Sequence, residues 1–134
     1  MLTGCRGSSD VVFVVDSSSV VDYWSFGYVK SFLADLVLDL AVDSGQIRVA
    51  LVTYGVVVLE RFNLIRYGER DDLSAAISST PYTRPTRQGT NTADAIAYVR
   101  QVLTLLLPLK DVMFLLRSVC LSVHRITEKV VNGF

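Results

Sequence analysis

The stretch Asp10-Val-Val-Phe-Val-Val-Asp16-Ser-Ser-Ser19 decides the fold. Between its two aspartates lies a continuous run of apolar, mostly β-branched side chains, which is typical of a strand buried on both faces of a parallel sheet. The run ends abruptly at Asp16 and the three serines after it. These polar residues predict a loop at the carboxyl end of the strand, and a strand of this kind indicates an α/β protein.

A helix is predicted after this loop, because apolar residues recur at helical spacing and charged residues fall on the other side. The apolar positions are Phe26, Val29, Leu33, Leu36, Val37 and Leu40. The charged positions are Lys30, Asp35 and Asp39. Residues 47–54, rich in Val, Thr and other β-formers, then predict a second strand. Strand, helix and strand form a βαβ unit, whose crossover is right-handed.

Residues 56–62 follow the second strand after one glycine and predict an antiparallel edge strand, joined to it as a hairpin. Residues 71–79 predict a short helix, and residues 80–89, with two prolines and a glycine, predict an irregular loop. A second long amphipathic helix is predicted from the spacing of Thr92, Ile96, Val99, Leu103 and Leu106. Pro108 ends or kinks that helix.

The last part of the chain, residues 108–134, is an atypical apolar tail. Its spacing favours a helix, although Val112 to Leu116 also fit a short buried strand. Charged residues interrupt the tail, so we expect no membrane-spanning helix. The 134 residues suffice for one domain, which we place at residues 10–107, before the tail.

The composition excludes several classes of function. The 13 basic side chains balance the 13 acidic ones, so we expect neither a nucleic-acid partner nor an anionic membrane. Cys5 and Cys120 have no metal-ligand spacing, and Cys5 is free to pair with a partner outside the chain. His124 has no nucleophile in a recognisable order, and no Gly-rich nucleotide loop follows the first strand. An enzyme is therefore not expected.

Three polar residues stand where the predicted topology brings them together. Asp16 and Ser18 follow the first strand, and Thr90 lies at the entrance to the later long helix. Ligands of open α/β sheets bind outside the carboxyl ends of the strands. A carboxylate with two hydroxyls is an all-oxygen set that suits a hard divalent cation such as Mg²⁺.

Three stretches in order resemble the von Willebrand factor type A (VWA) family: Asp10 to Ser19, Arg48-Val-Ala-Leu-Val-Thr-Tyr54 and Gly89-Thr-Asn-Thr-Ala-Asp-Ala95. Glu60-Arg-Phe-Asn-Leu64 and Leu73-Ser-Ala-Ala-Ile77 are similar to the versions of this domain in matrilins and non-fibrillar collagens. The resemblance implies a Rossmann-like, mostly parallel sheet flanked by helices, with an antiparallel edge strand. It also implies a partial domain, truncated before the fourth strand. The first strand then has an open edge. Either the apolar tail covers this edge, as a strand or a packed helix, or the chain is a fragment that folds poorly.

The resemblance further implies a metal-ion-dependent adhesion site, in which Asp16, Ser18 and Thr90 match the family's ligands. The family's second serine falls at Val20, whose side chain cannot bind a cation, unless the loop shifts and Ser19 replaces it. The family's fourth-strand aspartate is not found. A different interpretation stays open, in which Asp16 and the serines cap the first helix and satisfy backbone groups of the loop.

The function that the resemblance implies is protein binding in the extracellular matrix or in cell adhesion. The expected partner is collagen or another matrix protein, bridged by Mg²⁺. The location is inferred from the family, because the N-terminus shows no secretion signal. The alternatives are a metal-independent structural or assembly module and a non-functional fragment of a larger VWA protein. Tyr23, Trp24 and Tyr28 flank the metal loop and either form a recognition surface or pack at the helix start.

Overall fold

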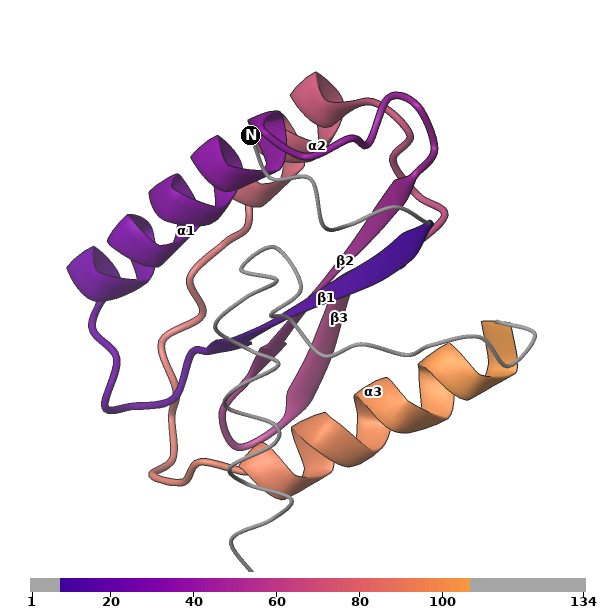
Figure 1. Ribbon diagram of the computed structural model, residues 1–134. Helices are drawn as coiled ribbons and strands as arrows, with labels where there is room; N and C mark the ends of the chain where they lie inside the picture. The colour runs from indigo at the N-terminus through magenta and orange to yellow at the C-terminus, as the bar shows by residue number, and fades with distance from the viewer. Residues whose placement is uncertain (1–7, 107–134) are drawn as a thin grey trace, which may run out of the picture.

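The computed structural model of the chain describes residues 8–106. Figure 1 shows a small sheet with α1 and α2 on one face and α3 on the other. The elements in chain order are β1 (Ser9–Asp16), α1 (Tyr23–Leu38), β2 (Ile47–Tyr54), β3 (Val58–Phe62), α2 (Arg70–Ser78) and α3 (Thr92–Leu106). The predicted α/β architecture, a sheet flanked by helices, is confirmed.

The sheet has the strand order β1-β2-β3. β1 and β2 pair in parallel over all eight residues of each strand. β3 runs antiparallel to β2, as predicted for an edge strand, with a register irregularity between Leu51 and Val52. It begins at Val58, two residues later than predicted, because Val56 and Val57 belong to the turn between the two strands.

β1 is buried on both faces, which confirms the prediction from its apolar run. Phe13 and Val15 belong to a core cluster that α1 and α2 cover, and Leu73 of α2 packs in the same cluster. Val12 belongs to a second cluster, on the other face, together with Val99 of α3. Because successive side chains of a strand alternate between faces, one apolar strand supplies both clusters.

An ion pair joins the two parallel strands at one register position. Arg48 donates through Nε to Oδ1 of Asp10 at 2.6 Å and through Nη2 to Oδ2 at 2.8 Å. The two residues are register partners, and the Asp10 side chain is only 12% exposed. Its hydrogen bond raises the pKa of Arg48. A bidentate pair of this kind adds geometric specificity, so it favours this register over a slipped one.

α1 begins after Asp22, whose carboxylate accepts a hydrogen bond from the backbone N–H of Ser25 at 2.7 Å. Most of the predicted apolar face is buried or partly buried. The buried residues of the helix are Phe26, Leu33, Ala34 and Val37. Two predicted positions differ, because Val29 is 39% exposed and Leu40 lies beyond the end of the helix.

The prediction that Lys30 lies on the solvent side of α1 is wrong. Its ammonium group donates to the backbone carbonyl oxygens of Ser78 at 3.1 Å and Thr80 at 2.8 Å. The long aliphatic stem lets the charge reach the end of α2, where free helix carbonyls attract a cation. Lys30 therefore joins α1 to α2, whereas Asp35 and Asp39 are exposed as predicted.

The later elements follow the prediction closely. α2 begins and ends one residue earlier than expected, the predicted irregular loop contains no helix or strand, and α3 covers the predicted positions. Within residues 8–106, β1 pairs with β2 alone. No helix in that range is long and apolar enough to cross a membrane. The predictions for Cys5, Pro108, Cys120, His124 and the tail concern residues outside the described range.

Replacing Leu73 by alanine is expected to lower the free energy of unfolding by about 2–5 kcal/mol, because it leaves a cavity in the core beneath α1 and α2. Urea unfolding followed by circular dichroism measures this loss. The matched control is Ile65→Ala, at a side chain that is 69% exposed, with an expected change within about 0.5 kcal/mol. Equal effects of the two changes would contradict the packing of α2 against the core.

The cap of α1 is expected to make stability depend on pH. Hydrogen bonds from the backbone and side chain of Ser25 lower the pKa of Asp22 from its ordinary 3.8. Because the folded-state pKa is the lower one, the stabilisation is present above the unfolded-state value and is lost as pH falls through the folded-state value.

The difference in melting temperature between wild type and Asp22→Ala is therefore expected to be largest near neutral pH and to shrink below about pH 4. Asp22→Asn keeps a hydrogen-bond acceptor without the charge, so it should stay capped and lose the pH dependence. Thermal unfolding across a pH series measures both effects. A difference that stays constant down to strong acid would rule out an ionised cap.

Candidate metal site

The candidate site lies at the carboxyl edge of the sheet, where three segments meet. These segments are the loop after β1, the turn after β2 and the loop before α3. The backbone N–H of Ser17 donates to the carbonyl oxygen of Tyr54 at 2.7 Å, and the N–H of Asn91 donates to the carbonyl oxygen of Gly55 at 2.8 Å. The turn after β2 therefore anchors the two loops that carry the predicted ligands.

Asp16 and Ser18 form a tight turn at the end of β1. Oδ1 of Asp16 accepts a hydrogen bond from the backbone N–H of Ser18 at 2.7 Å. The side chain of Ser18 is fully buried, and its Oγ has no hydrogen-bond partner among the described residues. Leaving a buried hydroxyl unsatisfied costs about 1–3 kcal/mol, so a ligand that bound this oxygen would relieve a real penalty.

Gly55 allows the loop after β1 to approach the turn after β2. A Cβ atom at this position would lie 3.2 Å from Cα of Ser18 and 3.4 Å from the carbonyl oxygen of Ser17. Both are backbone atoms, which cannot rotate away. Sequence reasoning did not assign this role to Gly55, although its place directly after a buried strand is a signal of close backbone approach.

The backbone position of Thr90 is set by the residues on either side of it. Gly89 has a φ of +145°, a conformation that favours glycine, and Asn91 precedes the first turn of α3. Asn91 caps that helix, because its Oδ1 accepts from the backbone N–H of Asp94 at 3.2 Å and its Nδ2 donates to the carboxylate of Asp94. The hydroxyl-bearing side chain of Thr90 itself is exposed.

Two other residues of the loop are turned toward solvent. Val20 is 81% exposed, and Ser19, the residue that would replace the missing second serine, is exposed as well. The helix-capping interpretation of Asp16 and the serines is wrong, because Asp22 is the N-cap of α1. Its second half agrees with the structure, since Asp16 does satisfy a backbone N–H of the loop.

The chemistry of the candidate ligands limits the kind of metal. Residues 8–106 contain no group of three or more His, Cys, Asp or Glu side chains that could hold a metal ion. A cation at this edge would therefore depend on one carboxylate, from Asp16, and on the hydroxyls of Ser18 and Thr90. An all-oxygen set of this kind fits a hard cation that keeps part of its water shell, as Mg²⁺ does.

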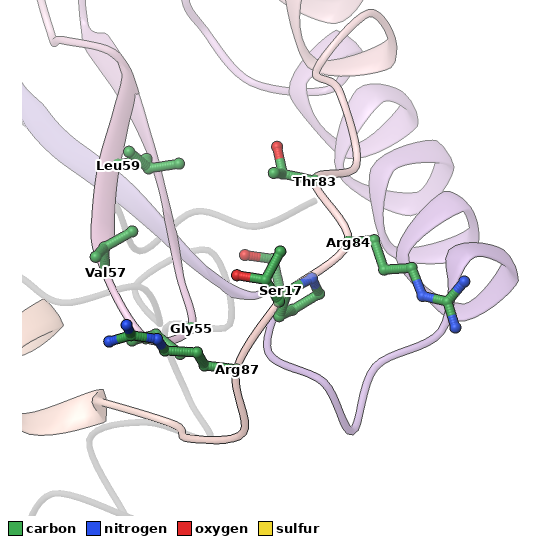
Figure 2. Close-up of a pocket in the computed structure, with 10 residues that line it drawn as sticks. Ser17, Gly55, Val57, Leu59, Thr83, Arg84 and Arg87 are labelled. Carbon is green, nitrogen blue, oxygen red and sulfur yellow. The ribbon is translucent and has the colours of Figure 1, made fainter.

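A cavity of about 330 Å³ borders the site (Figure 2). Val57 and Leu59 line one side, the loop of residues 83–87 lines the other, and Ser17 lies between them. Figure 2 shows Arg87 reaching from this loop toward Gly55, on the far side of the cavity. The cavity thus combines an apolar wall with a basic side chain next to the candidate metal loop.

The three aromatic residues at the start of α1 do not share one environment. The ring of Tyr23 packs edge-on against Trp24, with 5.6 Å between centroids, and against Tyr82 at 5.9 Å. Trp24 and Tyr28 nevertheless remain 72% and 73% exposed. Tyr23 is 63% exposed, so ring packing at the helix start covers only part of it, and all three side chains remain open to a partner.

A parallel β-α-β unit with a polar loop at the carboxyl edge places the chain among the open α/β domains. Residues 10–105 match the family model described as von Willebrand factor type A domain. The chain belongs to the VWA family, which confirms the resemblance seen in its sequence.

Its relatives include matrilins and a collagen chain. Matrilin-1 of Gallus gallus is 33% identical over 101 residues, which cover 72% of this chain and 20% of that protein. Matrilin-4 of Homo sapiens is 36% identical, with coverages of 75% and 16%. The collagen alpha-4(VI) chain of Mus musculus is 34% identical, with coverages of 69% and 4%. The chain thus spans a fifth or less of the length of these three relatives.

Solved structures show the same fold at lower sequence identity. Proximal thread matrix protein 1 from the mussel byssus aligns with a TM-score of 0.64 and 19% identity, covering 72% of this chain and 25% of that chain. Another structure of that protein is described as having a zinc-occupied MIDAS motif, that is, a metal-ion-dependent adhesion site. It aligns with a TM-score of 0.61 and 18% identity, covering 72% of this chain and 26% of that chain. At these identities the likeness shows the fold alone.

The close approach at Gly55 predicts a large effect from a single methyl group. Gly55→Ala is expected to lower the free energy of unfolding by about 1–3 kcal/mol, because the new Cβ forces the loop after β1 away from β2. Gly27→Ala is the control, since no atom lies within 4 Å of a Cβ at this position inside α1. It should instead gain about 0.5–1 kcal/mol from helix propensity. Thermal or urea unfolding measures both, and effects of the same sign would contradict the assignment.

Proposed function

We propose that the chain is a protein-binding module of the extracellular matrix or of cell adhesion, and not an enzyme. The observation that carries the proposal is the buried Ser18 hydroxyl, which lacks a hydrogen-bond partner in the described part of the chain. It follows Asp16 in a turn that already orients the carboxylate. Burial has already removed this hydroxyl from water. Binding a cation therefore breaks no hydrogen bond between this oxygen and solvent.

In this proposal Asp16, Ser18 and Thr90 hold a divalent cation, Mg²⁺. The cation supplies a positive charge that an acidic side chain of the partner binds, with water completing its coordination. The backbone anchors at Ser17 and Asn91 keep the two ligand-bearing loops near the turn after β2. The chain's own part is therefore to position one carboxylate and two hydroxyls at the edge of the sheet.

The relatives support the location and the class of partner. Two are matrilins and one is a collagen chain, and a structure with the same fold is described as a matrix protein with a zinc-occupied MIDAS motif. From this similarity we infer an extracellular location and a partner that is collagen or another matrix protein. The evenly balanced charge agrees with a protein partner and not with nucleic acid.

The cavity beside the site suggests how a partner is selected. Val57 and Leu59 offer apolar contacts, and Arg87 brings a positive charge to the same cavity, which Ser17 of the loop after β1 also lines. An arginine near a binding site attracts carboxylates and holds them in a defined geometry. A partner segment with an acidic residue beside an apolar one fits both features.

A second function is favoured by Val20. This residue stands where the family's site has an oxygen ligand, and its apolar side chain is 81% exposed. In a metal-independent structural or assembly module, Asp16 would only shape the loop, and partners would associate without a cation. The two functions differ in their response to metal, which makes them separable by experiment.

Thermal unfolding of the chain with Mg²⁺ and with EDTA tests the proposed site. A ligand that binds only the folded state raises stability, by about 1 kcal/mol at roughly five times its dissociation constant. Asp16→Ala is expected to abolish this increase. Ser18→Ala is expected to abolish it too, yet in EDTA this variant should be as stable as wild type or more stable, because it removes an unsatisfied buried hydroxyl.

Ser31→Ala, at an exposed serine of α1, is the matched control and should keep the full response to Mg²⁺. Ser19→Ala decides whether this exposed serine replaces the missing ligand, because only a ligand would reduce the response. Collagen binding measured with and without chelator extends the test to function. A cooperative unfolding transition whose midpoint does not change with Mg²⁺, together with partner binding unchanged by EDTA, would contradict the proposed metal site. That result would support the metal-independent module.

A further inference from the structure

The outer face of α1 carries an aromatic stripe, formed by Trp24, Tyr28 and Phe32. The three residues are spaced four apart, so their side chains lie on the same side of the helix. They are 72%, 73% and 65% exposed. Val20, in the loop before the helix, is a further exposed apolar residue, at 81%.

The fold does not need this stripe. α1 is attached to the sheet by a different set of residues, which are Phe26, Leu33, Ala34 and Val37. A helix with apolar residues on both its inner and outer faces is normally buried on both. Contiguous exposed apolar patches on folded domains mark sites of interaction with other proteins. Within residues 8–106, none of the three aromatic residues belongs to either core cluster, so the outer face of α1 is left exposed.

The charges around the stripe are acidic. Asp35 and Asp39 follow Phe32 by three and seven residues, which places them on the same side of the helix, and both are exposed. Lys30 is the one basic residue between Asp22 and Asp39, and its ammonium is directed to the carbonyls at the end of α2. No basic side chain therefore balances these two carboxylates from within α1.

The position of the two carboxylates adds to this imbalance. The last turn of α1 contains no basic residue, and Asp39 is the C-cap. The C-terminal end of a helix carries negative partial charge, so acidic groups there are unfavourable and a cation is favoured. Arg70 of α2 supplies one cation at this end, because it donates to the carbonyl oxygen of Leu38 at 3.2 Å, but its ion pair is with Asp43. Within residues 8–106, neither Asp35 nor Asp39 forms an ion pair, so both carboxylates are available to basic side chains of a partner.

We propose that the aromatic stripe is a second interface of this domain, which binds an amphipathic basic segment of a partner protein. Apolar side chains of the segment pack on Trp24, Tyr28 and Phe32, and its Lys or Arg side chains pair with Asp35 and Asp39. Basic side chains also interact favourably with the faces of Trp and Tyr rings. A second copy of this chain fits less well, because it would bring the same carboxylates against themselves.

This interface needs no cation, so it stands whether or not the proposed metal site does. Asp16, Ser18 and Thr90 lie in the loops at the carboxyl edge of the sheet, whereas the stripe runs along the helix that follows (Figure 1). The two surfaces belong to different segments and differ in chemistry. A matrix component could therefore bind at one while a different protein binds at the other.

Trp24 makes the interface directly observable, because it is the only tryptophan of the chain. The probe is a synthetic amphipathic helical peptide with leucines on one face and lysines on the other. Its counterpart has glutamates in place of the lysines. With the 134-residue chain in EDTA, the lysine peptide is expected to shift Trp24 emission to the blue in a saturable titration, and the glutamate peptide is expected to leave it unchanged.

Charge reversal gives the sharper result. The double change Asp35→Lys and Asp39→Lys is expected to weaken binding of the lysine peptide at least tenfold and to create binding of the glutamate peptide. Glu60→Lys with Asp94→Lys, at exposed residues on the α3 side of the sheet, makes the same change in net charge on the face opposite α1. This matched control should alter the affinity for either peptide less than twofold.

A second pair of variants tests the apolar contacts without touching the reporter. Tyr28→Ser together with Phe32→Ser is expected to reduce lysine-peptide affinity at least tenfold, while urea unfolding shows the domain still folded. Ser25→Ala with Ser31→Ala, at exposed positions of the same helix, is the control and should keep the affinity. Loss of binding only where folding is also lost would overturn the proposal.

Three other results would overturn it as well. A blue shift that grows with protein concentration without peptide, together with a dimer in analytical ultracentrifugation, would make a second copy the occupant. Emission typical of a buried tryptophan in the dilute monomer, unaffected by peptide, would mean that another part of this chain covers the stripe. Equal binding of both peptides would show that Asp35 and Asp39 play no part.

Discussion

The parallel pairing of β1 with β2 is the constraint on which the rest of the structure depends. It runs the full length of both strands and is held in register by the bidentate pair of Asp10 and Arg48. Both faces of these strands are covered, by α1 and α2 on one side and by α3 on the other. A slip of one residue would turn every apolar side chain to the opposite face and separate the two charges. The pairing therefore fixes where the strands end, and with them the loops that carry polar residues.

The close approach at the carboxyl edge follows from that pairing. Because the two strands end side by side, the turn after β2 lies directly against the loop after β1, and a Cβ atom at position 55 would crowd the backbone of Ser18. The Ser18 hydroxyl is buried at this approach and has no hydrogen-bond partner among residues 8–106. The unfavourable free energy of an unsatisfied buried group therefore falls on Oγ of Ser18, two residues after the Asp16 carboxylate of the candidate site.

The two surfaces proposed for this domain rest on different physics. At the sheet edge, Asp16 and two hydroxyls offer oxygen atoms whose attraction for a cation depends on how the loops are held. Along α1, the aromatic stripe and the carboxylates of Asp35 and Asp39 offer apolar area and charge that depend on the helix alone. A binding module with two such surfaces can connect two molecules, which suits a domain whose relatives are matrilins and a collagen chain.

The sequence by itself determined the helices and strands and their order, because the spacing of apolar residues and the positions of turn-forming residues are local properties of the chain. The antiparallel edge strand also followed from the sequence. The residues of the candidate metal site come from a family resemblance that the family match confirms, but the site itself stays a prediction. Only the tertiary structure decided that Lys30 turns inward to α2, that Asp22 rather than Asp16 caps α1, and that Gly55 makes room for Ser18. These three depend on contacts between segments distant in the chain or on the path of a loop, about which side-chain spacing carries no information.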